Sequence, residues 1–442
     1  MKRHKLEWYS RQALSGERNP AAAAGPPPNW PGDPTLSSRD EFIFLLHTAS
    51  EVEHALMAQY LYAAWSVGYR GAPAQGAAWA ARIMQVARQE MGHLITIQNI
   101  LRAMHAPLSL DRDDYPFRSE LYPFEFTLER VSLKSLAKYV LAEMPANPRF
   151  PAGLTEAEVR AAAEMDGVPT KVNRVGELFE RLLAMVAPSG LELSDADFYA
   201  ETVPMQAQAL DWTMDEPEQG VIVMTVADMA DARAALKAIA LQGEGLDTPQ
   251  PGAPPSHYDI FVELFMARRD TAVDPAAPVP ANPSTSPLPT EPGPDELAAG
   301  RILDRKSRHW ALLGNVHYRI LLTCIRHALS LPNGDADERE VRDQAFVEMR
   351  LMGRMGGLLA ALPLADSGTA ARAGMPLEMP YSLDFPDTPD GRWLLHRDLL
   401  RSSQKLSVTL EAMAELSEGE IALLKNIGVR TNAFLTKVEA HL

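Results

Sequence analysis

The sequence predicts a mainly α protein, built as a four-helix bundle with long crossover insertions and an additional C-terminal helical region. Three observations lead to this fold class. Long segments repeat apolar residues at spacings of three and four. Proline-rich stretches separate these segments, and a single short segment has the composition of a strand. With 442 residues, 46% of them hydrophobic, the chain can bury a large core.

The charge balance excludes some classes of partner. Lys and Arg number 42 against 58 Asp and Glu, a formal net charge of −16, which argues against nucleic acid or an anionic membrane as partner. No apolar run reaches membrane-spanning length, and the basic start has no apolar signal-peptide segment. The single cysteine, Cys324, lies in an apolar helical run and is expected to be a core thiol. We therefore expect a cytoplasmic protein.

The first third of the chain predicts an arm and two long helices. Residues 1–37 form a Pro/Ala-rich N-terminal arm. A helix over 40–67 follows, with Ser38 or Asp40 as its cap. "GYRGAP" interrupts it, and a second helix over 77–104 ends at "HAPL".

The rest of the bundle is punctuated by prolines. It is expected to contain a short helix, a longer helix, the strand "GVIVMTV" and two further helices. In that order they cover residues 132–143, 169–186, 220–226, 227–243 and 256–269. The bundle as a whole is expected to span residues 38–270.

The C-terminal part begins after a Pro-rich linker or surface loop at 271–295. Three helical stretches follow within the region 296–442. They cover residues 296–330, 335–362 and 391–441. These stretches are apolar enough either to pack on the bundle or to form a homodimer. The spacings between His309, His317 and His327, eight and ten, do not suit a metal pair, so we interpret these histidines as structural.

A carboxylate lies near mid-length on the apolar stripe of each of the first two helices, at Glu53 and Glu90. Burying an ionised carboxylate without a partner costs several kcal/mol, and neither stripe carries Lys or Arg. A divalent metal supplies the missing charge, and His93, three positions after Glu90, adds an imidazole on the same face. The alternative for Glu90 and His93 is an ordinary surface pair. Tyr60 either bonds to a ligand or relays an electron, or else is a plain core residue.

Five sequence blocks resemble the ferritin-like domain family typified by the iminophenyl-pyruvate dimer synthase of violacein biosynthesis. The blocks are "EVEHALMAQYLYA", "ARQEMGHLITIQNILRAMHAP", "RVGELFERL", "VADMADARAALKAIALQGEG" and "SHYDIFVEL". They occur in the family's order and span roughly residues 38–270. The resemblance implies a ferritin-like bundle that holds two iron ions, with manganese as an alternative.

The same resemblance implies three further metal ligands: Glu177, Glu244 and His257. This set departs from the usual pattern, because Glu244 and His257 are 13 positions apart rather than three. Glu177 lies beside the apolar stripe of its helix and fits a solvent-facing residue equally well.

Two metals with open coordination positions bind and activate dioxygen, so the first hypothesis is an oxidase or oxygenase of a small metabolite. The expected partners are dioxygen and that small molecule, which the resemblance implies is amino-acid-derived and part of secondary metabolism. The alternatives are a ferroxidase or iron-handling protein, a peroxide-dismutating protein, and a metal-free scaffold.

Overall fold

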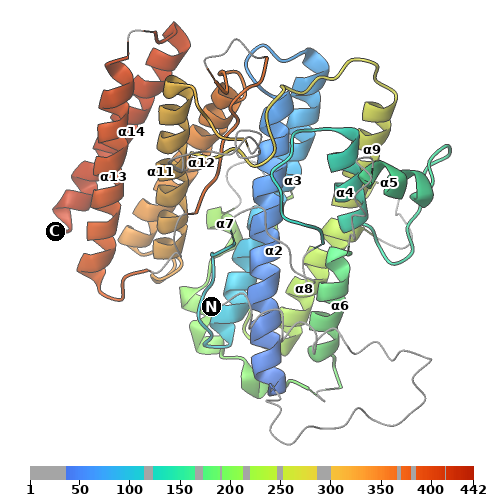
Figure 1. The fold of residues 1–442 in the computed structure, drawn as a ribbon. Helices are drawn as coiled ribbons and strands as arrows, with labels where there is room; N and C mark the ends of the chain where they lie inside the picture. Colours follow the sequence, from blue (N-terminus) through green and yellow to red (C-terminus); the bar gives the residue numbers. More distant parts are fainter. Residues whose placement is uncertain are drawn as a thin grey trace, which may run out of the picture.

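The computed structural model describes residues 36–113, 123–164, 173–189, 192–212, 220–245, 252–285, 300–365, 370–379, 385–413 and 415–442. In these ranges the chain forms α-helices and short 3-10 turns, with no β-strand (Figure 1). The mainly α class is therefore confirmed. None of the described helices is both long and apolar enough to cross a bilayer.

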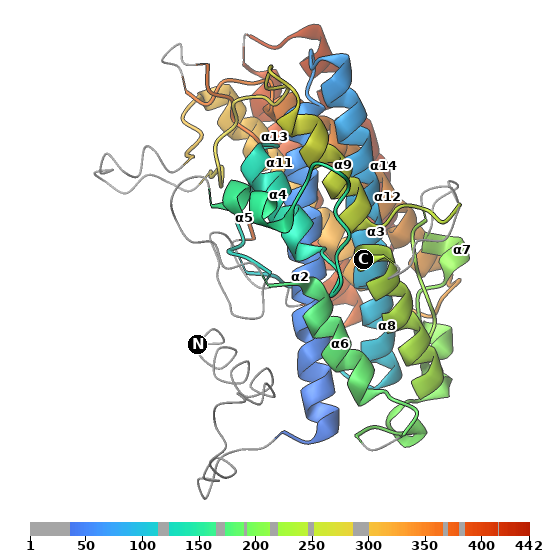
Figure 2. The ribbon, with the colours of Figure 1, turned by 90° about the vertical axis from the view of Figure 1, so that its right-hand side faces the viewer.

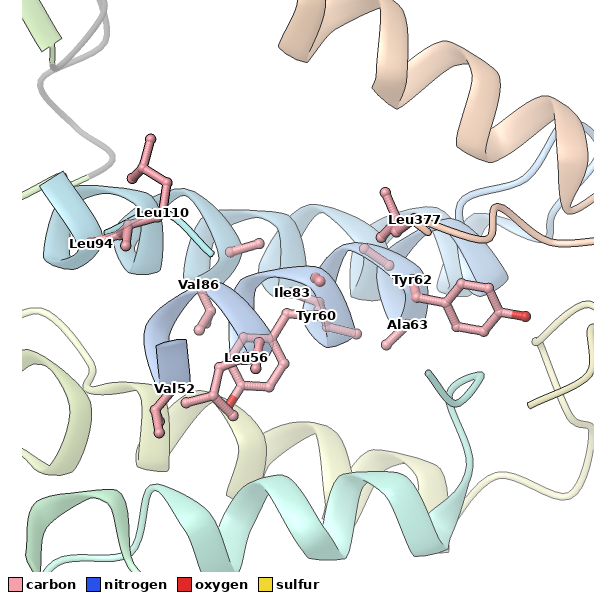
Figure 3. Packing of buried hydrophobic residues seen from close by; sticks show 14 of the residues in the cluster. Val52, Leu56, Tyr60, Tyr62, Ala63, Ile83, Val86, Leu94, Leu110 and Leu377 are labelled. Carbon is pink, nitrogen blue, oxygen red and sulfur yellow. The ribbon is translucent and has the colours of Figure 1, made fainter. Parts of the chain in front are cut away.

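Two helices of 30 residues each, α2 (Ser38–Val67) and α3 (Ala74–Ala103), lie side by side along the bundle (Figures 1 and 2). Ser37 caps α2 by accepting a hydrogen bond from the Asp40 backbone nitrogen at 3.1 Å. Leu56 of α2 and Val86 of α3 are among the buried side chains between the bundle helices (Figure 3). Burial of such a side chain contributes about 1.5–3 kcal/mol, so this pairing fixes the faces that carry Glu53 and Glu90.

Each of the other two sides of the bundle consists of two shorter helices. In both views α6 (Val175–Met185) continues below α4 (Leu133–Ala142), and α8 (Met229–Glu244) continues below α9 (His257–Arg269) (Figures 1 and 2). Helix α4 packs on α9 and on α5 (Glu156–Ala163), and α6 packs on α8. One half of the bundle thus consists of two unbroken helices, α2 and α3. In the other half, each side is interrupted between two shorter helices.

Residues 220–226, for which the sequence predicts a strand, are an extended segment without a strand partner among the described residues; we call this segment the strap. Side chains take the place of a neighbouring strand. Thr96 Oγ1 donates to the Ile222 oxygen at 3.1 Å, and Asn99 Nδ2 donates to the Met224 oxygen at 2.8 Å. A Cβ at Gly92 would lie 2.6 Å from the Ile222 oxygen, so glycine lets the strap lie against α3. The predicted strand is therefore wrong, because α3 satisfies its backbone groups.

Short elements lie between α6 and the strap along the chain. They are the 3-10 turns η1 (Asp195–Asp197) and η2 (Ala200–Met205) and the helix α7 (Ala209–Trp212).

The described part of the C-terminal region contains four helices: α11 (Arg305–Ala328), α12 (Ala336–Leu359), α13 (Pro389–Glu411) and α14 (Glu418–Ala440). The single helix expected over 391–441 is thus two helices. Helix α13 ends at Glu411, and Ser417 starts α14 with a capping box that includes Glu420. Helix α12 meets α2 closely, since a Cβ at Gly356 would lie 2.2 Å from the Trp65 ring.

The described part of the expected linker, residues 271–285, packs on the bundle. The backbone nitrogen of Ala277 donates to the Ser66 oxygen at 2.7 Å, and that of Asn282 donates to the Leu128 oxygen at 3.1 Å. Residues 1–35 of the N-terminal arm and residues 286–295 lie outside the described residues. The predicted boundaries between the arm, the bundle, the linker and the C-terminal region, after residues 37, 270 and 295, stay predictions.

The histidines of α11 bond to other protein groups. His317 Nδ1 lies 2.5 Å from Glu348 Oε2, and His327 Nδ1 lies 3.1 Å from His396 Nε2. His309 Nδ1 bonds to the Arg305 oxygen at 2.7 Å. Cys324 is buried, as expected for a core thiol.

Candidate metal centre

Two carboxylate–histidine triads share Glu90 inside the bundle. The first comprises Glu53, Glu90 and His93, and the second comprises Glu90, Glu143 and His257; within each, the candidate ligand atoms lie within 4.8 Å of one another. All five side chains are buried, none in a residue more than 3% exposed. Each oxygen of Glu90 serves one triad: Oε2 lies 2.9 Å from His93 Nδ1, and Oε1 lies 3.0 Å from His257 Nδ1.

Local structure explains how distant parts of the chain meet. Glu90 and His93 are three positions apart in the middle of α3 and so share a face. Glu143 is the C-cap of α4, and His257 is the first residue of α9, after the N-cap Ser256. The interrupted half of the bundle therefore supplies its ligands from helix ends. This explains the spacing of 13, because α8 ends at Glu244 and α9 restarts at His257.

The donor set fits a divalent metal pair. Glu90 Oε1 and His257 Nδ1 are buried and only 3.0 Å apart, yet neither has a hydrogen-bond partner among the described residues. Leaving a buried polar atom unsatisfied costs about 1–3 kcal/mol. Within the described ranges, no Lys or Arg forms an ion pair with Glu53, Glu90 or Glu143. A cation between these oxygen and nitrogen atoms satisfies all of them, and carboxylate with imidazole suits iron or manganese.

In the metal-free protein, the two imidazoles are protonated and supply the positive charge beside the carboxylates. Burial opposes a charged imidazole, but Glu53 and Glu90 raise the pKa of His93 to about 10. Burial likewise opposes charge on His257, but Glu90 and Glu143 raise its pKa to about 9. Burial and the charge of Glu90 raise the pKa of Glu53. Burial would also raise the pKa of Glu90, but His257 and His93 lower it below its usual range.

These shifts predict proton release on metal loading. At pH 7 both imidazoles are protonated without metal, so binding of two divalent ions is expected to release at least about two protons per chain, and the raised pKa of Glu53 adds to this release. Metal affinity is therefore expected to rise with pH until the imidazoles lose their protons, at about pH 9 for His257 and about pH 10 for His93. Titration with Mn(II) in weakly buffered solution containing a pH indicator measures the release. Metal binding without acidification would contradict the assignment of both histidines.

The same raised pKa values make the stability of the metal-free protein depend on pH. A raised histidine pKa stabilises the folded chain fully below the ordinary value of 6.5. That contribution is lost as the pH rises through about 9 to 10.

The structure does not bring Glu177 to the centre. Its side chain is 53% exposed and lies 3.5 Å from Arg174 on the surface of α6. Glu177 is displaced from the buried face of α6, which includes Leu178 and Leu182, so it turns away from the bundle. Glu143 stands in the place expected for it.

Glu244 lies beside the triads but belongs to neither of them. Its Oε1 atom is 3.6 Å from Arg174 Nη1, and a Cβ at Gly176 would come within 1.3 Å of the same oxygen. Glu244 also lines a pocket of about 290 Å³, a volume that includes open solvent at its mouth. All five triad residues line this pocket, and Phe179 and Ile239 contribute apolar lining. The pocket therefore lies directly against the centre.

Tyr60 contacts the centre through Glu143. Its hydroxyl donates to Glu143 Oε1 at 2.5 Å, and its ring packs edge-on against Tyr139 with centroids 4.9 Å apart. Burial and the charges of Glu143 and Glu90 raise the pKa of Tyr60 well above its usual value. Tyr60 thus stays a neutral donor that orients a candidate ligand.

Sequence reasoning missed Glu143, although the signal was present. Leu136, Tyr139 and Val140 precede it by seven, four and three positions and are all buried. This is the same apolar stripe with one carboxylate that marks Glu53 and Glu90.

His54, next to Glu53, bonds to groups outside the candidate metal centre. Its Nδ1 donates to the Leu110 oxygen at 2.8 Å, and its Nε2 accepts from the Tyr318 hydroxyl at 2.5 Å. Burial and the charge of Arg112 lower the pKa of His54 to about 3, so the ring is neutral. It joins α2 to α11 and is not part of either triad.

The chain is similar to known proteins in sequence. A family model described as "Ferritin-like" matches residues 46–266, a range that contains all five triad residues. A curated relative, dichlorochromopyrrolate synthase from Lentzea aerocolonigenes, is 24% identical over 392 residues, which is 78% of this chain. The matched part is 36% of that protein, so the chain spans about a third of the relative's length. The crystal structure of a ferritin-like protein from Caulobacter vibrioides is 16% identical with a TM-score of 0.46, covering 75% of this chain and 96% of that one.

Proposed function

This chain belongs to the ferritin-like family, and we propose that it is a di-iron enzyme that oxidises a small organic metabolite with dioxygen. One observation carries the proposal. Glu90 offers one oxygen to each of two buried carboxylate–histidine triads, the arrangement used by di-iron carboxylate bundles.

The residues divide into two ligand groups. Glu53 and His93 would hold one metal, Glu143 and His257 would hold the other, and Glu90 would contact both. Iron bound there supplies the redox chemistry towards dioxygen, and manganese is the alternative metal.

The protein's own contributions are orientation and exclusion of water. Tyr60 holds Glu143 by donating its hydroxyl proton at 2.5 Å. The triads are buried, which keeps bulk water from the reacting groups. The pocket is lined both by the triad residues and by apolar side chains, among them Leu56, Phe179 and Ile239. This combination favours a substrate with an apolar body.

The relative supports a metabolite of secondary metabolism as the substrate. Its name states that it makes dichlorochromopyrrolate. Because this chain spans about a third of that protein, the reaction itself does not transfer. We therefore propose the coarser class, a small amino-acid-derived molecule.

The dependence of dioxygen consumption on an organic substrate distinguishes an oxidase from an iron-handling protein. Dioxygen consumption by the reduced, iron-loaded protein is expected to depend on an organic substrate, with one product formed in proportion. An oxygen electrode combined with mass spectrometry measures both, using aromatic amino acids and their imine derivatives as the panel.

Other outcomes would point to the alternatives. Many turnovers of Fe(II) oxidation without any organic substrate, with ferric iron accumulating, would favour a ferroxidase. Rapid oxygen evolution from hydrogen peroxide would favour a peroxide-dismutating protein. Glu90→Ala is the negative control for all three assays.

A further inference from the structure

Each candidate histidine ligand contacts a glutamine on the side away from the carboxylates. His93 Nε2 lies 2.9 Å from Gln242 Oε1, and His257 Nε2 lies 3.0 Å from Gln89 Oε1. The two rings stack with centroids 5.5 Å apart. The glutamines come from α8 and α3, so each histidine is contacted from a helix other than its own.

The Gln242 contacts determine which nitrogen of His93 carries a proton when the ring is neutral. Gln242 Nε2 donates to the Gly220 backbone oxygen at 2.7 Å, so it is the amide oxygen that faces His93. An amide oxygen only accepts, and His93 Nε2 must therefore be the donor. This leaves the Nδ1 lone pair directed at Glu53 and Glu90, where a metal ligand needs it.

The strap bonds to Gln242 and passes close to Gln89. Gly220 begins it with φ +64°, and a Cβ there would lie 3.1 Å from Gln89 Nε2 and 3.4 Å from Gln242 Nε2. Two residues later, Ile222 is held against α3 by Thr96 and by the close approach at Gly92. The position of the strap along α3 is therefore set one residue away from His93.

We infer that Gln89 and Gln242, which lie beside the start of the strap, are positioning residues that present both imidazoles to the metals through Nδ1. The inference rests on the proposed function, since it concerns the metal ligands. Both partners are neutral amides, whereas a carboxylate at the same place makes an imidazole a more basic ligand. The glutamines thus hold the ring orientation without adding negative charge to a centre that already has three carboxylates.

Titration of the purified full chain with Co(II), followed by its visible absorption, tests this role. Gln242→Leu is expected to weaken one of two Co(II) ions by about 10–100-fold and leave the other nearly unchanged. Gln89→Leu is expected to weaken the other ion, and Gln89→Leu/Gln242→Leu to weaken both. In a His93→Ala background, Gln242→Leu is expected to have no further effect, whereas Gln89→Leu keeps its effect.

Gln242→Glu keeps nearly the same side-chain shape but replaces the neutral amide with a carboxylate. It keeps an acceptor for His93 Nε2 but loses the bond to the Gly220 oxygen, so it is expected to bind Co(II) more tightly than Gln242→Leu, which removes both. Gln98→Leu is the matched control, because Gln98 is a buried glutamine of α3 that bonds to Ser50 Oγ at 2.8 Å instead. It is expected to leave both Co(II) affinities unchanged.

The two proposals fail differently. If the unaltered chain binds no Co(II), the metal function is overturned and this inference with it. If the unaltered chain binds two ions and the Gln89 and Gln242 variants bind them equally well, only the positioning role is overturned. An equal loss in Gln98→Leu would also overturn it, because the effect would then come from the helix in general.

Discussion

Glu90→Ala is expected to reduce metal binding from about two ions per chain to none. Glu90 is the one residue common to both triads, with Oε2 in the first and Oε1 in the second. Its removal leaves each pair of remaining ligands without the oxygen between them. Anaerobic loading with Fe(II), followed by gel filtration and elemental analysis, gives the stoichiometry. Full occupancy in this variant would remove Glu90 from the ligand set.

Two further variants make the comparison specific. Glu143→Ala is expected to lose one ion, because Glu143 belongs to the second triad alone. Glu177→Ala is expected to keep both, since its carboxylate is half-exposed and lies beside Arg174. The reverse result would restore the ligand set implied by the family resemblance.

His317→Leu is expected to lower the free energy of unfolding by about 3–5 kcal/mol, the second large effect. His317 Nδ1 and Glu348 Oε2 are 2.5 Å apart, and both residues are wholly buried. Leucine leaves Glu348 as a buried carboxylate without the histidine. Urea unfolding followed by circular dichroism measures the change.

A double variant separates loss of the pair from loss of packing. His317→Leu/Glu348→Met replaces both partners with apolar groups of similar volume and is expected to recover most of the lost stability. If the free energy of unfolding of His317→Leu lies within about 1 kcal/mol of that of the unaltered protein, the pair contributes little to stability.

The sequence was most informative where a helix is continuous. Glu53, Glu90 and His93 could be predicted because α2 and α3 are unbroken, so helical spacing alone places each residue on the core face. The resemblance supplied His257, which periodicity could not, since the residue starts a new helix. Glu143 ends an apolar stripe of the same kind, but it does so at the C-cap of a helix of only 10 residues.

The remaining errors concern segments whose structure depends on distant partners. The composition of the strap is that of a strand, but Thr96 and Asn99 occupy its backbone groups. The apolar period of 391–441 continues past the break, and only the capping box at Ser417 marks the start of α14. Local patterns state what a segment prefers, and the tertiary partner decides which preference is realised.

The adjacency of Glu53 and His54 ties the centre to the C-terminal region. Glu53 enters a triad, and the next residue, His54, bonds to Tyr318 of α11, so two adjoining faces of the same helical turn are fixed at once. A slip of one residue in α2 turns the helix by about 100° and withdraws both groups together. The bundle and the C-terminal helices are therefore expected to melt in one transition, and removal of α11 would loosen the alignment of the centre. We therefore expect the C-terminal region to act as part of the scaffold of the candidate metal centre rather than as a detachable module.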